Sequence, residues 1–140
     1  MKRDARAEAE RWLAQADDEY KDADFLMQAR RFYLSLYLCQ QSAEKALKAF
    51  IYFKEQEPVM SHSISVLVDV AAAIDPDFET LVIAKRLDDY YIPTRYPNGL
   101  PGDIPSRYYT DEDEAKRALS LSDSVIRLVK SKIGKEFSCD

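Results

Sequence analysis

A row of polar side chains lies in the stretch LCQQSAEKALKAF, which spans residues 38–50. On a helix, at about 100° per residue, four of them share one side: Gln41, Glu44, Lys45 and Lys48. This polar stripe is either a solvated face with weak pairs between neighbours four residues apart, or a partly covered anion site. In the second case Lys45 or Lys48 binds the anion. Glu44 then orients the lysine and Gln41 donates hydrogen bonds.

A second group of candidate residues lies in the loop YYIPTRYPNGLPGDIPSRYY, from Tyr90 to Tyr109. It holds five of the nine tyrosines, together with Arg95 and Arg107. Guanidinium groups beside aromatic rings suit phosphate binding and base stacking. The alternative is a structural cover, whose tyrosines pack on the helices and whose arginines pair with acidic residues.

His62 is the only histidine in the chain. A multi-histidine metal centre is therefore excluded within one chain, and catalysis by a histidine pair would need two chains. Phosphate-loop, dinucleotide-binding, serine-hydrolase and zinc-protease motifs are absent. The acidic runs 17–19 and 88–89 predict solvated faces, because adjacent helical residues diverge by about 100°. We therefore assign no catalytic residue and expect neither a metal nor a cofactor.

Helices must position these residues, because apolar side chains recur at three- and four-residue spacing along most of the chain. The pattern predicts helices at about 4–28 and 32–54, a third capped by Ser61 or Ser63, a fourth from Pro76, and a last one capped by Thr110. Four of the six prolines lie between residues 91 and 109 and predict an irregular connection. We expect an all-α, up-and-down antiparallel bundle of four or five helices with one irregular Pro/Tyr-rich crossover loop.

The helix at 32–54 is predicted to be apolar on more than one side. Its core face holds Leu36, Cys39, Ala43, Ala46, Leu47 and Phe50, while Leu34, Leu38 and Ala49 border the polar stripe. Such a helix has more than one packing partner. We therefore expect this helix to be central or to contribute to a homodimer interface.

The composition indicates one folded domain. Of the 140 residues, 46% are hydrophobic and 32% charged, and the formal net charge of −5 gives no general nucleic-acid footprint. The two cysteines lack metal-site spacing, the N-terminus lacks a signal-peptide core, and no apolar run reaches the roughly 20 residues of a membrane span. We expect a cytoplasmic protein without membrane contact, with a helical domain at 1–134 and a disordered tail at 135–140.

Several motifs together resemble the HEPN domain family, the higher eukaryotes and prokaryotes nucleotide-binding domains. They are Trp12-x3-Ala16-x3-Tyr20, QQSAEKALKA at 40–49, SHSI at 61–64 and RYP at 95–97. The resemblance covers about residues 12–128. It implies a helical bundle that commonly dimerises, binds a nucleotide of the ATP or GTP class, and acts with a minimal nucleotidyltransferase partner.

The HEPN family also includes RNase toxins, and these members look to share an Arg-x4–6-His motif. No arginine precedes His62 by four to six residues here, so the chain resembles the branch without that motif. By resemblance, the ligand-binding residues fall on Gln41, Glu44, Lys45, Lys48, His62, Arg95 and Tyr96. The implied function is non-catalytic nucleotide binding. One alternative is an RNase toxin of a toxin–antitoxin pair, which would bind RNA, although no residue pattern in the chain supports RNA binding. The other is a component of such a pair that acts only through protein contacts.

Overall fold

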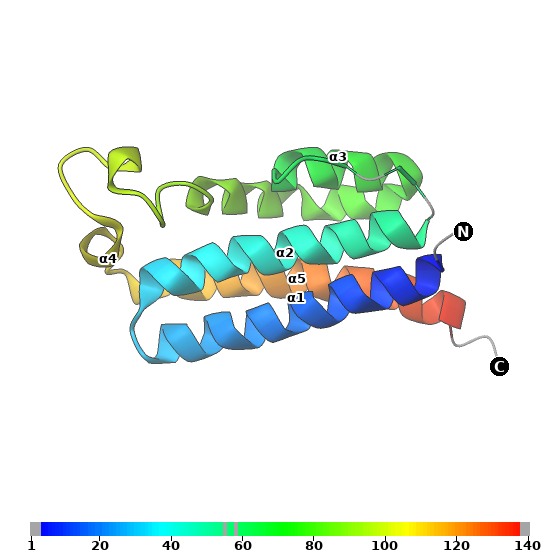
Figure 1. Ribbon diagram of the computed structural model, residues 1–140, viewed down its shortest axis with the longest axis horizontal. Helices are drawn as coiled ribbons and strands as arrows, with labels where there is room; N and C mark the ends of the chain where they lie inside the picture. The colour runs from blue at the N-terminus through cyan, green and yellow to red at the C-terminus, as the bar shows by residue number, and fades with distance from the viewer. Residues whose placement is uncertain (1–3, 55, 58, 138–140) are drawn as a thin grey trace.

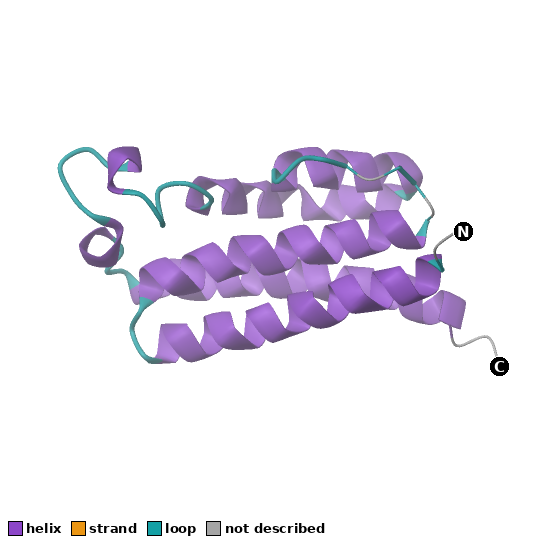
Figure 2. Cartoon of the chain, in the orientation of Figure 1, coloured by secondary structure: helices purple, strands orange, loops and turns teal. Residues whose placement is uncertain are grey.

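The chain is a bundle of helices in the computed structural model, which describes residues 4–54, 56–57 and 59–137. Its long helices are α1 (Ala5–Gln28), α2 (Phe32–Phe53), α3 (Ile64–Ile74), η1 (Pro76–Tyr90) and α5 (Glu112–Phe137). The described residues form no strand (Figure 2). The predicted all-α bundle is confirmed, with five long helices. α1 and η1 run toward one end of the molecule, and α2 and α5 run back from it (Figure 1).

The α1–α2 hairpin has a defined start and a defined turn. Asp4 caps α1, because its carboxylate accepts hydrogen bonds from the backbone N–H groups of Arg6 and Ala7. At the turn, Arg30 adopts a positive φ of 62°. Its neighbour Arg31 donates its N–H to the carbonyl of Leu26 at 2.8 Å, which closes the end of the helix in a Schellman-type turn. The break predicted at these two arginines is confirmed.

α2 is the central helix of the bundle, in contact with α1, α3, η1, α4 and α5. All six residues assigned to its core face are buried: Leu36, Cys39, Ala43, Ala46, Leu47 and Phe50. Between α2 and α5 the hydroxyls of Ser42 and Ser122 form a buried hydrogen bond of 2.5 Å. The small side chains at this contact allow the two helices to approach closely.

α3 and η1 form a second hairpin, whose start is fixed by two side chains. Ser63 caps α3 by accepting the N–H of Val66, as one of the two expected alternatives. Asp88, at the far end of η1, accepts the N–H groups of Ile64 at 2.6 Å and Ser65 at 3.0 Å. The expectation that Asp88 belongs to a solvated face is therefore wrong. Its carboxylate satisfies backbone donors that the first turn of α3 leaves unpaired.

The crossover contains more regular structure than expected. It includes η2 (Pro97–Gly99) and α4 (Pro105–Tyr108), each a single turn, and projects beyond the end of the bundle (Figure 1). Asp111 replaces Thr110 as the residue that caps α5, because its carboxylate accepts the N–H of Asp113 at 2.9 Å. α5 continues through the expected boundary at residue 134 to Phe137, and the rest of the expected tail lies outside the described residues.

Candidate functional site

The polar stripe of α2 is centred on a buried ion pair. Glu44 is 4% exposed and Lys48 is 7% exposed. The Lys48 Nζ lies 3.0 Å from Glu44 Oε2. Charged groups are buried in proteins only when they are paired or hydrogen-bonded, because desolvation of a lone charge is costly. The stripe is thus a covered polar site at these two positions and not a solvated face.

The Glu44 carboxylate also holds the segment before α3. His62 Nδ1 lies 3.1 Å from Glu44 Oε2, a contact in which a protonated Nδ1 donates to the carboxylate. Gln40 Nε2 donates to the backbone carbonyl of His62 at 2.8 Å. Gln41 Nε2 donates to Glu44 Oε1 at 3.4 Å and to the Gln40 side chain at 2.7 Å. The buried carboxylate therefore has three donors and fixes one ring nitrogen of His62.

Lys45 connects the stripe to α1. Its Nζ donates to Gln41 Oε1 at 3.2 Å and lies 3.1 Å from Glu19 Oε1. The Glu19 carboxylate is mostly buried, so the expectation that it lies on a solvated face is wrong. Trp12 of α1 also covers the stripe, with its ring centre 5.9 Å from the Lys48 ammonium. α1 thus forms one wall of the polar site.

Arg95 stands in a cage of three tyrosine rings. Its guanidinium carbon is 4.8 Å from the ring centre of Tyr37, 4.6 Å from that of Tyr91 and 5.0 Å from that of Tyr96. Arg95 Nε donates to the carbonyl of Tyr91 at 2.8 Å. Within the described parts of the chain Arg95 forms no ion pair, so the alternative in which the loop arginines pair with acidic residues does not hold for Arg95.

Tyr37 shows the electrostatic character of this cage. Burial raises the pKa of its phenol, and the nearby Arg95 charge opposes that rise. Tyr37 belongs to α2 and lies four residues before Gln41, on the same side of the helix. The cage therefore continues the polar stripe toward the crossover end of the bundle.

His62 links the ion pair to the cage. Its ring stacks on Tyr91, with 5.6 Å between ring centres and 20° between ring planes. The His62 side chain is 59% exposed, although its Nδ1 reaches a buried carboxylate. Met60, Asp88 and Tyr91 line an adjoining pocket of about 480 Å³ with His62. The protein holds the imidazole by Nδ1 and by one ring face, and the other ring nitrogen forms no hydrogen bond with a described residue.

The structure thus brings all seven proposed site residues together. Gln41, Glu44, Lys45, Lys48 and His62 form one hydrogen-bonded network, and Arg95 and Tyr96 join it through the ring of Tyr91. The role of Tyr91 and the contribution of Tyr37 were not predicted. Spacing contained a signal for Tyr37, which shares a helical face with Gln41. Only the tertiary fold places Tyr91 between His62 and Arg95.

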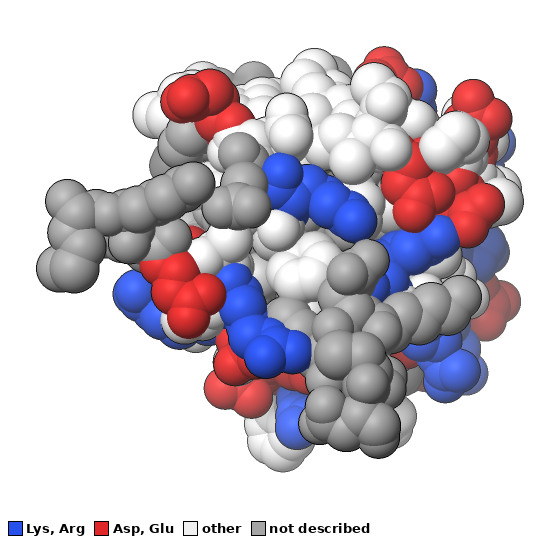
Figure 3. All heavy atoms as spheres, turned by 90° about the vertical axis from the view of Figure 1, so that its right-hand side faces the viewer, with Lys and Arg blue, Asp and Glu red and all other residues white. Residues whose placement is uncertain are grey.

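The described residues contain no group of three or more His, Cys, Asp or Glu side chains placed to hold a metal ion. No described helix is long and apolar enough to cross a bilayer. At the end of the bundle where α1 begins and α5 ends, basic and acidic side chains are interspersed (Figure 3). That face is therefore not a uniformly basic surface of the kind that binds nucleic-acid backbones.

Comparisons with known proteins identify the family. The HEPN domain model matches residues 9–132. The crystal structure of TT1696 from Thermus thermophilus is 35% identical, with 89% of this chain and 97% of that chain covered at a TM-score of 0.78. ST0689, described as an archaeal HEPN homologue, is 30% identical, with coverage of 95% and 99% and a TM-score of 0.74. The search of curated proteins gave no match. The chain belongs to the HEPN domain family.

Proposed function

We propose that this protein binds a nucleotide of the ATP or GTP class at the surface formed by His62 and the Arg95 cage. The observation that carries the proposal is the Arg95 guanidinium, held among three tyrosine rings without an ion-pair partner in the described chain. A guanidinium so placed offers a planar donor to a phosphate. The exposed ring of Tyr96 offers a stacking surface to a base.

The buried network has a positioning role in this proposal. Lys48 is paired with Glu44 and has little exposed surface, so its charge acts through the carboxylate and not as a direct ligand. Glu44 holds the ring of His62 in place, and Gln41 in turn holds Glu44. Lys45 connects the network to Glu19 of α1. The direct ligand contacts are assigned to Arg95, Tyr96 and His62.

The experiment is a thermal-shift comparison with ATP, GTP and their monophosphates at up to millimolar concentration. A ligand at 100 times its Kd stabilises the folded state by about 2.7 kcal/mol, enough to raise the Tm by several degrees. Arg95→Ala should remove most of the increase. Arg107→Ala removes an exposed arginine of the same crossover and should retain it. No increase with any nucleotide would contradict direct nucleotide binding.

We further propose that the protein is a homodimer that acts with a minimal nucleotidyltransferase. Membership of the HEPN family supports this, since its members are commonly dimers and are proposed partners of such enzymes. Light scattering at tens of micromolar tests the dimer, and a monomer would reject it. Co-purification of the tagged chain with a nucleotidyltransferase encoded beside it tests the partnership, with and without nucleotide. If a stable complex forms and nucleotides leave it unchanged, a pure protein-interaction role is favoured.

A second candidate function is RNA cleavage, favoured by the contact between Glu44 and His62. A carboxylate that holds one imidazole nitrogen leaves the other to accept a proton, as a general base requires. Arg95, which contacts the same Tyr91 ring as His62, would offer a positive charge to the phosphate of the RNA backbone. The test is cleavage of a single-stranded RNA by the wild type and by His62→Ala. Unchanged cleavage in the variant would exclude this use of His62.

A further inference from the structure

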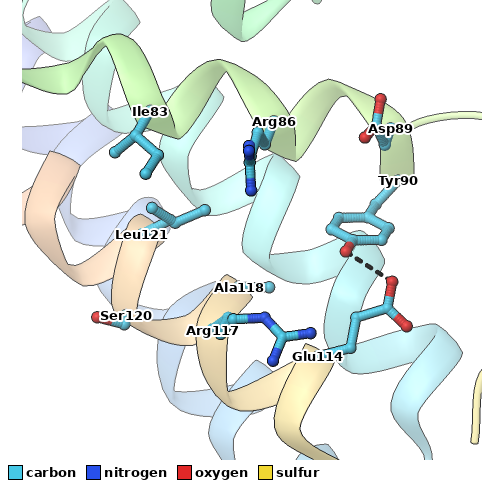
Figure 4. A pocket seen from close by; sticks show the side chains of 9 residues that line it. All are labelled: Ile83, Arg86, Asp89, Tyr90, Glu114, Arg117, Ala118, Ser120 and Leu121. Carbon is cyan, nitrogen blue, oxygen red and sulfur yellow. Dashed lines mark hydrogen bonds between the residues drawn. The ribbon is translucent and has the colours of Figure 1, made fainter. Parts of the chain in front are cut away.

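A second pocket lies between η1 and α5, apart from the residues described above. It has a volume of about 410 Å³, within the range of small-molecule sites. Arg86 reaches into it from η1 and Arg117 from α5 (Figure 4). None of the residues that line it belongs to the polar stripe or to the Arg95 cage.

The two arginines of this pocket form almost no ion pairs with described residues. Arg86 forms no ion pair with any described residue, and Arg117 forms only a long one, at 4.0 Å, with the exposed Asp111. Glu114, the acidic side chain of α5 that lines the pocket, accepts a hydrogen bond of 2.8 Å from the hydroxyl of Tyr90. Burial and this hydrogen bond raise the pKa of Tyr90. Glu114 is therefore engaged with Tyr90, and neither arginine has a close ion-pair partner among the described residues.

The opposite end of the pocket is apolar. Ile83 and Leu121 lie together there, away from Tyr90 and Glu114 (Figure 4). Ile83 is 56% exposed and is not part of the buried core. Its side chain lines the pocket instead, where an apolar group of a ligand would cover it.

We propose that this pocket binds a small amphipathic anion with a single acidic headgroup. Its carboxylate or phosphate head lies between Arg86 and Arg117, and its short apolar body lies against Ile83 and Leu121. Two guanidinium groups are suited to one oxyanion, because each offers planar paired donors. The carboxylates of Asp89 and Glu114 balance the two arginines in formal charge. The pocket therefore disfavours a polyanion such as a nucleoside triphosphate.

The test is NMR titration of the assigned Ile83 and Leu121 methyl groups with four probes: acetate, hexanoate, inorganic phosphate and hexyl phosphate. We expect saturable shifts at both methyl groups. Each six-carbon probe should bind at least tenfold more tightly than its headgroup alone, because each methylene removed from water adds affinity. Tighter binding of hexanoate identifies a carboxylate ligand, and tighter binding of hexyl phosphate identifies a phosphate monoester.

Variants distinguish specific binding through the two arginines from non-specific binding of apolar anions to the protein surface. Arg86→Gln with Arg117→Gln should weaken hexanoate and hexyl phosphate binding at least tenfold. Arg127→Gln, an arginine of α5 outside the pocket, should leave it unchanged. Asp89→Asn should strengthen binding two- to threefold by removing a repelling charge. Because both pocket arginines are exposed, the double variant should keep the wild-type Tm.

The result that overturns the proposal is wild-type binding of both six-carbon probes by the double variant, or shifts that map away from Ile83 and Leu121. Arg95→Ala should leave these titrations unchanged. The proposal for this pocket and the proposal for the nucleotide site can therefore be contradicted independently of each other.

Discussion

The His62 ring is held by Glu44, with Nδ1 3.1 Å from the carboxylate Oε2. The same oxygen accepts the Lys48 ammonium at 3.0 Å. A mostly exposed imidazole is thereby fixed to an ion pair that is almost wholly buried. The polar stripe of α2 therefore positions the exposed ring of His62. The effects of this arrangement on stability and on ligand binding can be measured.

Replacing one member of the buried pair should be more costly than replacing both. Lys48→Met leaves the Glu44 charge without its cation and should lower the free energy of unfolding by about 3–5 kcal/mol. Adding Glu44→Leu should recover most of the loss, because an apolar pair of similar size needs no desolvation. Urea unfolding measures both. Equal losses in the single and double variants would contradict the assignment of a coupled pair.

Asp88 should stabilise the start of α3, and with it the position of His62. Asp88→Ala removes the acceptor for Ile64 N, Ser65 N and Ser63 Oγ, and should cost about 1–3 kcal/mol. Its neighbour Asp89 is exposed, so Asp89→Ala should change stability by less than about 0.5 kcal/mol. Urea unfolding of the matched variants checks the difference. Similar stability in the two would show that Asp88 does not act as a cap.

Alkaline pH should destabilise the fold through Tyr109. Burial, followed by the charge of Glu114, raises the pKa of Tyr109 to about 12. The phenol ionises near pH 10 in an unfolded chain. Below pH 10 its contribution to stability is therefore complete, and it declines as pH rises from 10 toward 12.

Tyr109→Phe removes this titration, so stability should depend less steeply on pH in that range. Urea unfolding at pH 9, 10 and 11 measures the slope, and absorbance at 295 nm follows the ionisation of the wild-type phenols. A slope identical in the wild type and the variant would contradict the role of Tyr109.

The sequence predicted the helices and the core of α2 because both depend on local spacing. Leu36, Cys39 and Phe50 recur on one side of a helix and are buried together. The start of α1 at Asp4 follows from the preference of short acidic side chains for N-caps. These features need no knowledge of distant contacts.

The burial of the site could not be predicted from spacing. Glu44 and Lys48 look like any solvated i,i+4 pair until the segment before α3 and the wall of α1 cover them. The cap of α3 by Asp88 joins residues 24 positions apart. Tyr91 acquires its role only where the fold stacks it between His62 and Arg95.

The most direct test of the proposed function is calorimetric titration of ATP and GTP into the wild type, Arg95→Ala and Arg107→Ala. If the Arg95 cage binds the nucleotide, the wild type and Arg107→Ala should bind one of them with the same Kd. Arg95→Ala should bind it at least tenfold more weakly while remaining folded in the absence of ligand. Equal affinity in Arg95→Ala and the wild type would contradict the assignment of the nucleotide site to this cage.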